Sequence, residues 1–230
     1  YRSLWMQGFK AVREAVQAKG LLIIQLVMIA LFLLIMAIGD GVTSLSQIGQ
    51  TTVMAVSAQT TTGFSLLDPV ELSSGTLLVF ILAMLIGGCI GSTAGGIKVF
   101  RLQVLLKLYQ LTILRINQSS SAVTQDKLGH HHLSNALIQG TLCSVFLFLT
   151  TIIVSWLPFL LLDYDPLLSL FDIVSAVGTV GLSTGLTSTE LPTFLKGVLM
   201  VDMTLGRLEI IPILVLFSKN AWFSKRRDNR

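Results

Sequence analysis

The chain has 230 residues, of which 53% are hydrophobic and only 12% are charged. Soluble domains carry about 25% charged residues, so this composition excludes an ordinary soluble protein and predicts an integral membrane protein. The basic residues behind the net charge of +4 lie mostly at the ends of apolar segments. They form no basic stripe with interleaved aromatic residues, so no nucleic-acid partner is predicted.

The first part of the chain alternates between a long apolar segment and a short one. Residues 1–19 predict an amphipathic cytoplasmic lead-in helix. Residues 20–39 are uncharged, and as a helix they are long enough to cross a hydrocarbon core of about 30 Å. Residues 44–59 predict a short helix that enters the membrane partway and returns as extended chain. Irregular backbone at that depth must be buried in protein or line a wet cavity.

A glycine-rich stretch interrupts the next apolar segment. Residues 73–86 cover about 21 Å as a helix, which is short of a full crossing. Residues 87–96 then contain five glycines, and each glycine costs about 1 kcal/mol in a helix relative to alanine. We therefore expect a broken helix that resumes over residues 97–115. The stretch is not a phosphate-binding loop, because Ile97 stands where that motif requires lysine.

The second part of the chain repeats this order. A polar stretch with three adjacent histidines, unaccompanied by other metal ligands, predicts a solvated loop. A long apolar segment over residues 133–162, a short helix over 166–178 and a last span over 193–217 follow. The predicted parts are a lead-in (1–19), a span–pore helix–span repeat (20–116), a cytoplasmic loop (117–132), a second repeat (133–218) and a basic cytoplasmic tail (219–230).

One string of residues occurs twice, each time at the end of a short helix. Ser-Ala-Gln-Thr-Thr-Thr-Gly-Phe-Ser (57–65) and Ser-Ala-Val-Gly-Thr-Val-Gly-Leu-Ser (175–183) match at an offset of 118 residues. The second copy contains the first three residues of the Thr-Val-Gly-Tyr-Gly filter of potassium channels, in which backbone carbonyls replace the water shell of an ion. We name the first filter as Thr61, Thr62, Gly63 and Phe64, and the second filter as Thr179, Val180, Gly181 and Leu182.

The residue types of the two filters suit a dehydrated monovalent cation. Such an ion needs several oxygens at once, and backbone carbonyls and threonine hydroxyls supply them without an anion that binds too tightly. For successive carbonyls to point one way, alternate residues need left-handed dihedrals, which glycine adopts without steric cost. Gly63 and Gly181 stand where that need arises. Each short helix would direct the partial negative charge of its C-terminal end toward the ion.

Charge distribution predicts the orientation of the chain. Most basic residues fall in the lead-in, in residues 98–127 and in the tail, which places these parts in the cytoplasm and both filters at the outer face. An even number of full crossings per repeat keeps the filters on one face, so we expect parallel repeats. The predicted fold is an all-α integral membrane protein with two parallel span–pore helix–span repeats.

The second predicted repeat carries charged residues at membrane depth. Arg207 is about halfway along the last span, where an arginine faces the protein interior or a wet cavity. It forms a structural ion pair with Asp202 or another carboxylate, or it has a role in a pore. Asp172, on the second short helix, hydrogen-bonds behind the second filter or tunes the ion site. No nucleophile–base–orienter set occurs, so we predict no enzyme.

Together these residues resemble the Trk/Ktr/HKT superfamily of potassium transporters, and in particular the C-terminal half of a bacterial TrkH-type subunit. The resemblance rests on residues 57–65, 87–98, 175–186 and 206–209. It implies four repeats around one pseudo-fourfold pore in the bacterial inner membrane, of which this chain holds the third and fourth. It also implies a gate beneath the filters, made of an intramembrane loop and a pore arginine: Gly87, Gly88, Gly91, Ser92, Thr93, Gly95, Gly96, Lys98 and Arg207.

The resemblance further implies the partners of the chain. They are a transported potassium ion without an organic cofactor, membrane lipid, an N-terminal half with the other two repeats, a second copy in a homodimer, and a cytoplasmic nucleotide-binding regulatory ring of the TrkA/KtrA kind. The second filter is closer to Ktr than to many Trk sequences, which leaves the ring type and the coupling ion open.

Several interpretations stay open. A glycine patch for close helix packing is the alternative to a gating loop at residues 87–96. A carrier that couples sodium or protons to potassium by alternating access is the alternative to a channel-like pore. A membrane scaffold that transports nothing is the third possibility.

Overall fold

The computed structural model describes residues 16–39, 45–117, 127–128, 131–132 and 134–208. Within these residues the fold is helical except for one short hairpin. The elements are α3 (Val16–Gly39), α4 (Leu45–Gln59), the 3-10 helix η1 (Pro69–Glu71), α5 (Ser74–Leu85), α6 (Val99–Asn117), β1 (Lys127–Leu128), β2 (His131–His132), α7 (Asn135–Leu161), α8 (Pro166–Val177) and α9 (Thr193–Leu208).

Two of the helices are long and apolar enough to cross a membrane. They span Gln17–Gly39, within α3, and Asn135–Leu161, which is α7. The predicted lead-in at 1–19 lies mostly outside the described residues, and α3 already begins at Val16. The predicted last span begins at Thr193, as α9 does, and its residues beyond 208 are likewise outside the described part.

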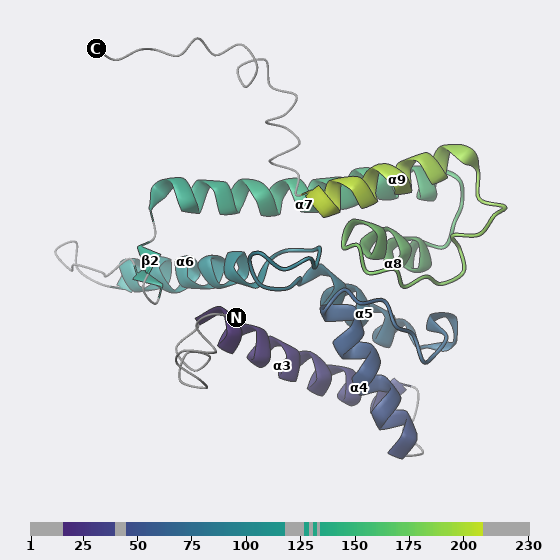
Figure 1. The fold of residues 1–230 in the computed structure, drawn as a ribbon, viewed down its shortest axis with the longest axis horizontal. Helices are drawn as coiled ribbons and strands as arrows, with labels where there is room; N and C mark the ends of the chain where they lie inside the picture. The colour runs from purple at the N-terminus through teal and green to yellow at the C-terminus, as the bar shows by residue number, and fades with distance from the viewer. Residues whose placement is uncertain (1–15, 40–44, 118–126, 129–130, 133, 209–230) are drawn as a thin grey trace, which may run out of the picture.

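The helices follow the predicted order twice. The short helices predicted over 44–59 and 166–178 are α4 and α8, and the predicted break between two helices lies between α5 and α6. α8 begins sharply because Asp165 caps its first turn and Pro166 is its first residue, a position that suits proline. Figure 1 shows α7 and α9 side by side with α8 next to them. α5 packs on α8 and also on α3 and α4.

The polar stretch that we predicted as a loop over 117–132 is more structured than expected. α6 continues to Asn117, and β1 pairs antiparallel with β2, with Lys127 opposite His132 and Leu128 opposite His131. Two residues separate the strands, and the first of them is a glycine. This spacing is typical of tight hairpins.

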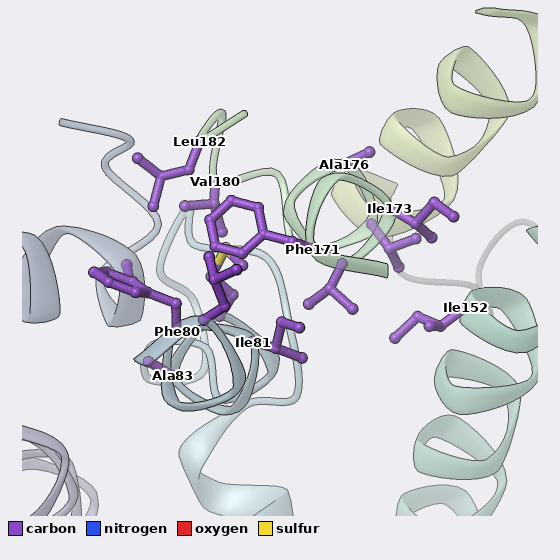
Figure 2. Close-up of a cluster of buried hydrophobic side chains, with 14 of the residues drawn as sticks. Phe80, Ile81, Ala83, Ile152, Phe171, Ile173, Ala176, Val180 and Leu182 are labelled. Atoms are coloured by element: carbon purple, nitrogen blue, oxygen red, sulfur yellow. The ribbon is translucent and has the colours of Figure 1, made fainter. Parts of the chain in front are cut away.

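The hydrophobic core joins the two repeats and supports the second filter. Phe80 of α5 stacks edge-on between Phe32 of α3, at a ring-centroid distance of 4.2 Å, and Phe171 of α8, at 6.3 Å. Figure 2 shows Phe171 beside the side chains of Val180 and Leu182, which are buried in the same cluster. Because these side chains are immobilised in the core, the filter backbone between them is held against α5 and α8.

Candidate functional site

The helices α4 and α8 end in the same hydrogen-bonded turn. After α4, Thr61 N donates to Ala58 O at 3.3 Å and Thr62 N donates to Ser57 O at 2.9 Å. After α8, Thr179 N donates to Ala176 O at 3.0 Å and Val180 N donates to Ser175 O at 2.9 Å, which are the same bonds 118 residues later. This 5→2 and 6→1 pattern is a Schellman motif, which requires a left-handed residue directly after the C-cap residue.

Threonine occupies that left-handed position in both copies. Thr61 has φ +54° and Thr179 has φ +52°, although β-branched residues rarely adopt a positive φ. Two residues later, Gly63 has φ +82° and Gly181 has φ +90°. The alternation of left-handed residues that we predicted from the glycines is confirmed, and it extends to two threonines that the sequence did not identify for this reason. Such backbone strain costs about 1–3 kcal/mol per residue and is found at functional sites.

The two filters lie directly next to each other. A Cβ atom added at Gly63 would overlap the Val180 carbonyl oxygen and reach the carbonyl carbon of Gly181 at 3.7 Å. A Cβ atom at Gly181 would meet nothing within 4 Å. The side chains also differ, because Phe64 is 70% exposed whereas Leu182, its equivalent, is 4% exposed. The backbones of the two filters therefore share one small region, with open space on the far side of the second filter.

The chain between α5 and α6 forms a compact loop, residues 86–98, which we call the crossing loop. Its two ends are joined by a parallel bridge between Ile86 and Ile97. Gly87 N donates to Ile97 O at 2.9 Å and Val99 N donates to Gly88 O at 3.1 Å. These residues are not helical, but Gly95 packs closely on the end of α8, so the glycine patch for close packing stays an alternative to the gating loop. Among the predicted gate residues, Gly87, Gly88, Gly95 and Lys98 are buried, Gly96 is half-buried, and Gly91, Ser92 and Thr93 form the exposed tip.

Two positively charged side chains donate hydrogen bonds to three consecutive backbone carbonyls of the crossing loop. Lys98 Nζ donates to Ser92 O at 3.2 Å and to Ala94 O. Arg207 Nη1, on α9, donates to Thr93 O between them. Hydrogen bonds from charged donors contribute about 1.5–3 kcal/mol each. The loop is therefore fastened internally by Lys98, at its own C-terminal end, and externally by Arg207 to the last described turn of α9.

Asp202 is not the partner of Arg207 in this structure. Asp202 Oδ1 instead accepts a hydrogen bond from Ser155 Oγ of α7 at 2.6 Å. The ion pair that we considered from the sequence is thus replaced by a bond to a backbone carbonyl 114 residues away. No sequence signal identifies such a partner, because every residue carries a carbonyl group.

The crossing loop, α9 and the second filter meet at the end of α8. A Cβ atom added at Gly95 would overlap the Gly178 carbonyl oxygen and lie 2.6 Å from Thr179 Oγ1. A Cβ atom at Gly206 would overlap the Val177 carbonyl oxygen. The loop therefore lies in direct contact with the beginning of the second filter, on the side where α8 ends.

Asp172 confirms the prediction of hydrogen bonds behind the second filter. Its carboxylate accepts bonds from Ser183, Thr184 and Thr187, which follow the filter in the chain. Elsewhere in the described part, no three or more His, Cys, Asp or Glu side chains group together.

The chain is similar to known cation transport proteins over most of its length. A family model described as TrkH, cation transport protein, matches residues 15–225. An uncharacterized cation transporter of Methanocaldococcus jannaschii is 39% identical over 163 residues, covering 71% of this chain and 34% of the relative. The Trk system potassium uptake protein TrkI of Halomonas elongata is 32% identical over 212 residues, covering 90% of this chain and 43% of the relative.

A solved structure has the same fold. The crystal structure of the potassium transporter TrkH from Vibrio parahaemolyticus superposes with a TM-score of 0.82, over 94% of this chain and 47% of that one, at 24% sequence identity. The chain thus spans less than half the length of these relatives.

Proposed function

The chain belongs to the TrkH family of cation transport proteins, and we propose that it forms two of four repeats around a pore for potassium uptake. In this proposal the two filters stand side by side at the outer end of the pore. The names of the relatives from Halomonas elongata and Escherichia coli, Trk system potassium uptake proteins, support potassium as the transported ion.

One observation carries the proposal: the two filters are adjacent and have the same alternating backbone. Left-handed residues at Thr61 and Gly63, and again at Thr179 and Gly181, favour carbonyls that turn toward one side. Two such strings supply half of a ring of oxygens, and the other half would come from two repeats outside this chain. A ring of carbonyls replaces the hydration shell of an ion without a negative charge to trap it.

We propose the crossing loop as a gate for the same pore. Its contact with the beginning of the second filter at Gly178 and Thr179 supports a position beneath the filters. The bond from Arg207 to Thr93 would hold the gate closed, and the bonds from Lys98 would preserve the shape of the loop. The glycines at 91 and 96, both with positive φ, would allow the loop to change conformation when it moves aside.

The partners belong to the same proposal. We propose that an N-terminal half supplies the two other repeats, that two such subunits form a homodimer in a plasma membrane, as in the bacterial inner membrane, and that a cytoplasmic nucleotide-binding ring controls the gate. The described helices that are long enough to span a membrane support the membrane location. The dimer and the ring rest on the family resemblance alone.

A coupled carrier is the second candidate function, and Asp202 is the observation that favours it. This carboxylate is 1% exposed, and its Oδ2 atom has no hydrogen-bond partner among the described residues. A buried carboxylate with a free oxygen at membrane depth is a possible site for a coupled proton or sodium ion.

Reconstitution of the full-length protein separates these functions. We expect potassium flux into liposomes, and discrete single-channel current steps in planar bilayers. Potassium flux that requires a proton or sodium gradient, without current steps, would favour the coupled carrier. Absence of any cation flux from correctly folded protein would contradict both.

A further inference from the structure

Asp172 is a buried carboxylate in the middle of the apolar helix α8, with only 3% of its surface exposed. Its neighbours Phe171 and Ile173 are completely buried in the hydrophobic core (Figure 2). A carboxylate in such surroundings needs hydrogen-bond donors, because its desolvation is otherwise costly. Its donors come from one short segment, residues 183–187, which directly follows the second filter.

Four donors surround the two carboxylate oxygens. Oδ1 accepts from Thr184 N at 2.8 Å and Thr184 Oγ1 at 3.1 Å. Oδ2 accepts from Ser183 Oγ at 3.0 Å and Thr187 N at 3.3 Å. Ser183 Oγ also accepts from Gly185 N at 3.0 Å and contacts Thr187 Oγ1 at 2.6 Å. An ionised aspartate is an acceptor only, with about four lone-pair sites, so it matches this set of donors.

The equivalent position behind the first filter holds a methionine. Met54 precedes Asp172 by the repeat offset of 118 residues, and it is also completely buried. Its sulfur accepts a single contact, from Leu67 N at 3.3 Å, and a thioether is a weak acceptor. The segment after the first filter is therefore held from this position by one weak bond, whereas the segment after the second filter is held by four bonds to a charged group.

α8 thus holds the second filter at both of its ends. At the start, the Schellman turn fixes Thr179 and Val180 to the last turn of the helix. At the end, Asp172 fixes Ser183 and Thr184, directly after Leu182. A filter that is held at both ends resists contraction around an ion smaller than potassium.

We propose that Asp172 is a positioning residue that sets potassium-over-sodium selectivity by fixing the C-terminal end of the second filter. This inference rests on the proposed function of the two filters. Asp172 touches no ion itself; it acts through the backbone that it holds. Its loss would let the carbonyls between Thr179 and Leu182 follow a sodium ion inward, so the discrimination between the two ions would fall.

The test is the potassium/sodium permeability ratio of the full-length protein in planar bilayers, measured from reversal potentials. Asp172→Asn keeps the size of the side chain but directs an NH2 group at two of the four donors. We expect the ratio to fall about tenfold, which corresponds to about 1.4 kcal/mol. Asp172→Met copies the first repeat, and we expect a fall at least as large. A purely structural role would lower thermal stability without changing this ratio.

Asp165→Asn is the matched control, because it neutralises the aspartate that caps the same helix. Asp165 is exposed and caps α8 by accepting from Leu167 N at 2.9 Å and Leu168 N at 3.0 Å. Asparagine is an equally good N-cap, so we expect an unchanged permeability ratio.

Ser183→Ala keeps the test decisive if Asp172→Asn does not fold. It removes one donor from Oδ2 and leaves the carboxylate in place, so we expect a smaller fall of the ratio in the same direction. A wild-type ratio in a conducting Asp172→Asn protein, or in Ser183→Ala where the first variant is not recovered, overturns the inference. A wild-type protein that conducts no potassium would instead refute the proposed function of the filters.

Discussion

The helices that follow the two filters begin alike and end differently. α5 stops at Leu85 and gives way to the crossing loop, whereas α9 continues unbroken through the equivalent positions to Leu208. At one equivalent pair, Gly88 lies in the loop and Gly206 lies in a helix pressed against the Val177 carbonyl. The two equivalent positions therefore differ in structure, with a non-helical loop after α5 and, within the described residues, an unbroken helix in α9. In the proposed gate, the loop would be the part that moves and α9 the part against which it closes.

The filters themselves show a second difference of the same kind. Their backbone turns and positive φ values are the same in both copies. The residues that hold them differ, with Met54 in one repeat and Asp172 in the other. The two copies therefore share one backbone conformation and differ in the side chains that support it.

The largest expected effect is a loss of potassium selectivity, and it should be greater at Gly63 than at Gly181. At Gly63, serine would have both an unfavourable φ and an overlap with the Val180 carbonyl, whereas at Gly181 only the φ is unfavourable. We expect Gly63→Ser to lower the potassium/sodium permeability ratio about a hundredfold, equivalent to about 2.7 kcal/mol, and Gly181→Ser to lower it less. Reversal potentials of the full-length protein measure both. An unchanged permeability ratio in both variants would contradict the proposal that these two segments select potassium.

The next effect concerns the bond that connects the repeats. Arg207→Ala removes the guanidinium that binds Thr93 O, and a bond of this kind contributes about 1.5–3 kcal/mol. We therefore expect a several-fold rise in potassium flux into liposomes. Lys196→Ala is the control, since Lys196 lies on the same helix and donates to Thr189 O outside the crossing loop. Lower flux at normal protein levels would show that Arg207 is structural.

A third prediction uses thermal stability to test whether α9 packs tightly against the end of α8. Gly206→Ala places a methyl group on the Val177 carbonyl oxygen, and overpacking of this kind costs about 1–3 kcal/mol. Gly140→Ala in α7 meets nothing within 4 Å and is expected to stabilise by up to about 1 kcal/mol. Thermal unfolding of the detergent-solubilised protein compares them. Equal melting temperatures would mean that α9 does not press on the end of α8.

The last prediction concerns the core between the repeats, where we expect an effect no larger than that of Gly206→Ala. Phe80→Leu keeps most of the buried volume but removes both ring contacts, each worth about 0.5–1.5 kcal/mol. The equivalent residue in the second repeat is Val198, so the same aromatic stack is absent there. We expect a modest fall in the melting temperature and no change in selectivity. A variant as stable as wild type would show that the rings contribute only their volume.

The sequence predicted the helices and the positive φ of Gly63 and Gly181 because their signals are local. Uninterrupted apolar segments, five closely spaced glycines and the Asp165-Pro166 pair identify the spans, the crossing loop and the start of α8. Gly63 and Gly181 could be recognised because glycine is the residue that tolerates a positive φ at no cost.

The remaining features depend on groups that the sequence does not distinguish. The left-handed φ of Thr61 and Thr179 follows from backbone hydrogen bonds at the helix ends, and threonine normally argues against that conformation. Arg207 binds a backbone carbonyl rather than the nearby Asp202. The hairpin at Lys127 depends on two short strands, which carry too few residues for a periodic pattern.

Anomalous scattering from thallium or rubidium in crystals of the full-length protein tests the central claim most directly. We expect a peak between the two filters, flanked by the carbonyl oxygens of residues 61–64 and 179–182. A bound ion that is absent from this position, or that lies only at Asp202, would contradict a pore built from the paired filters.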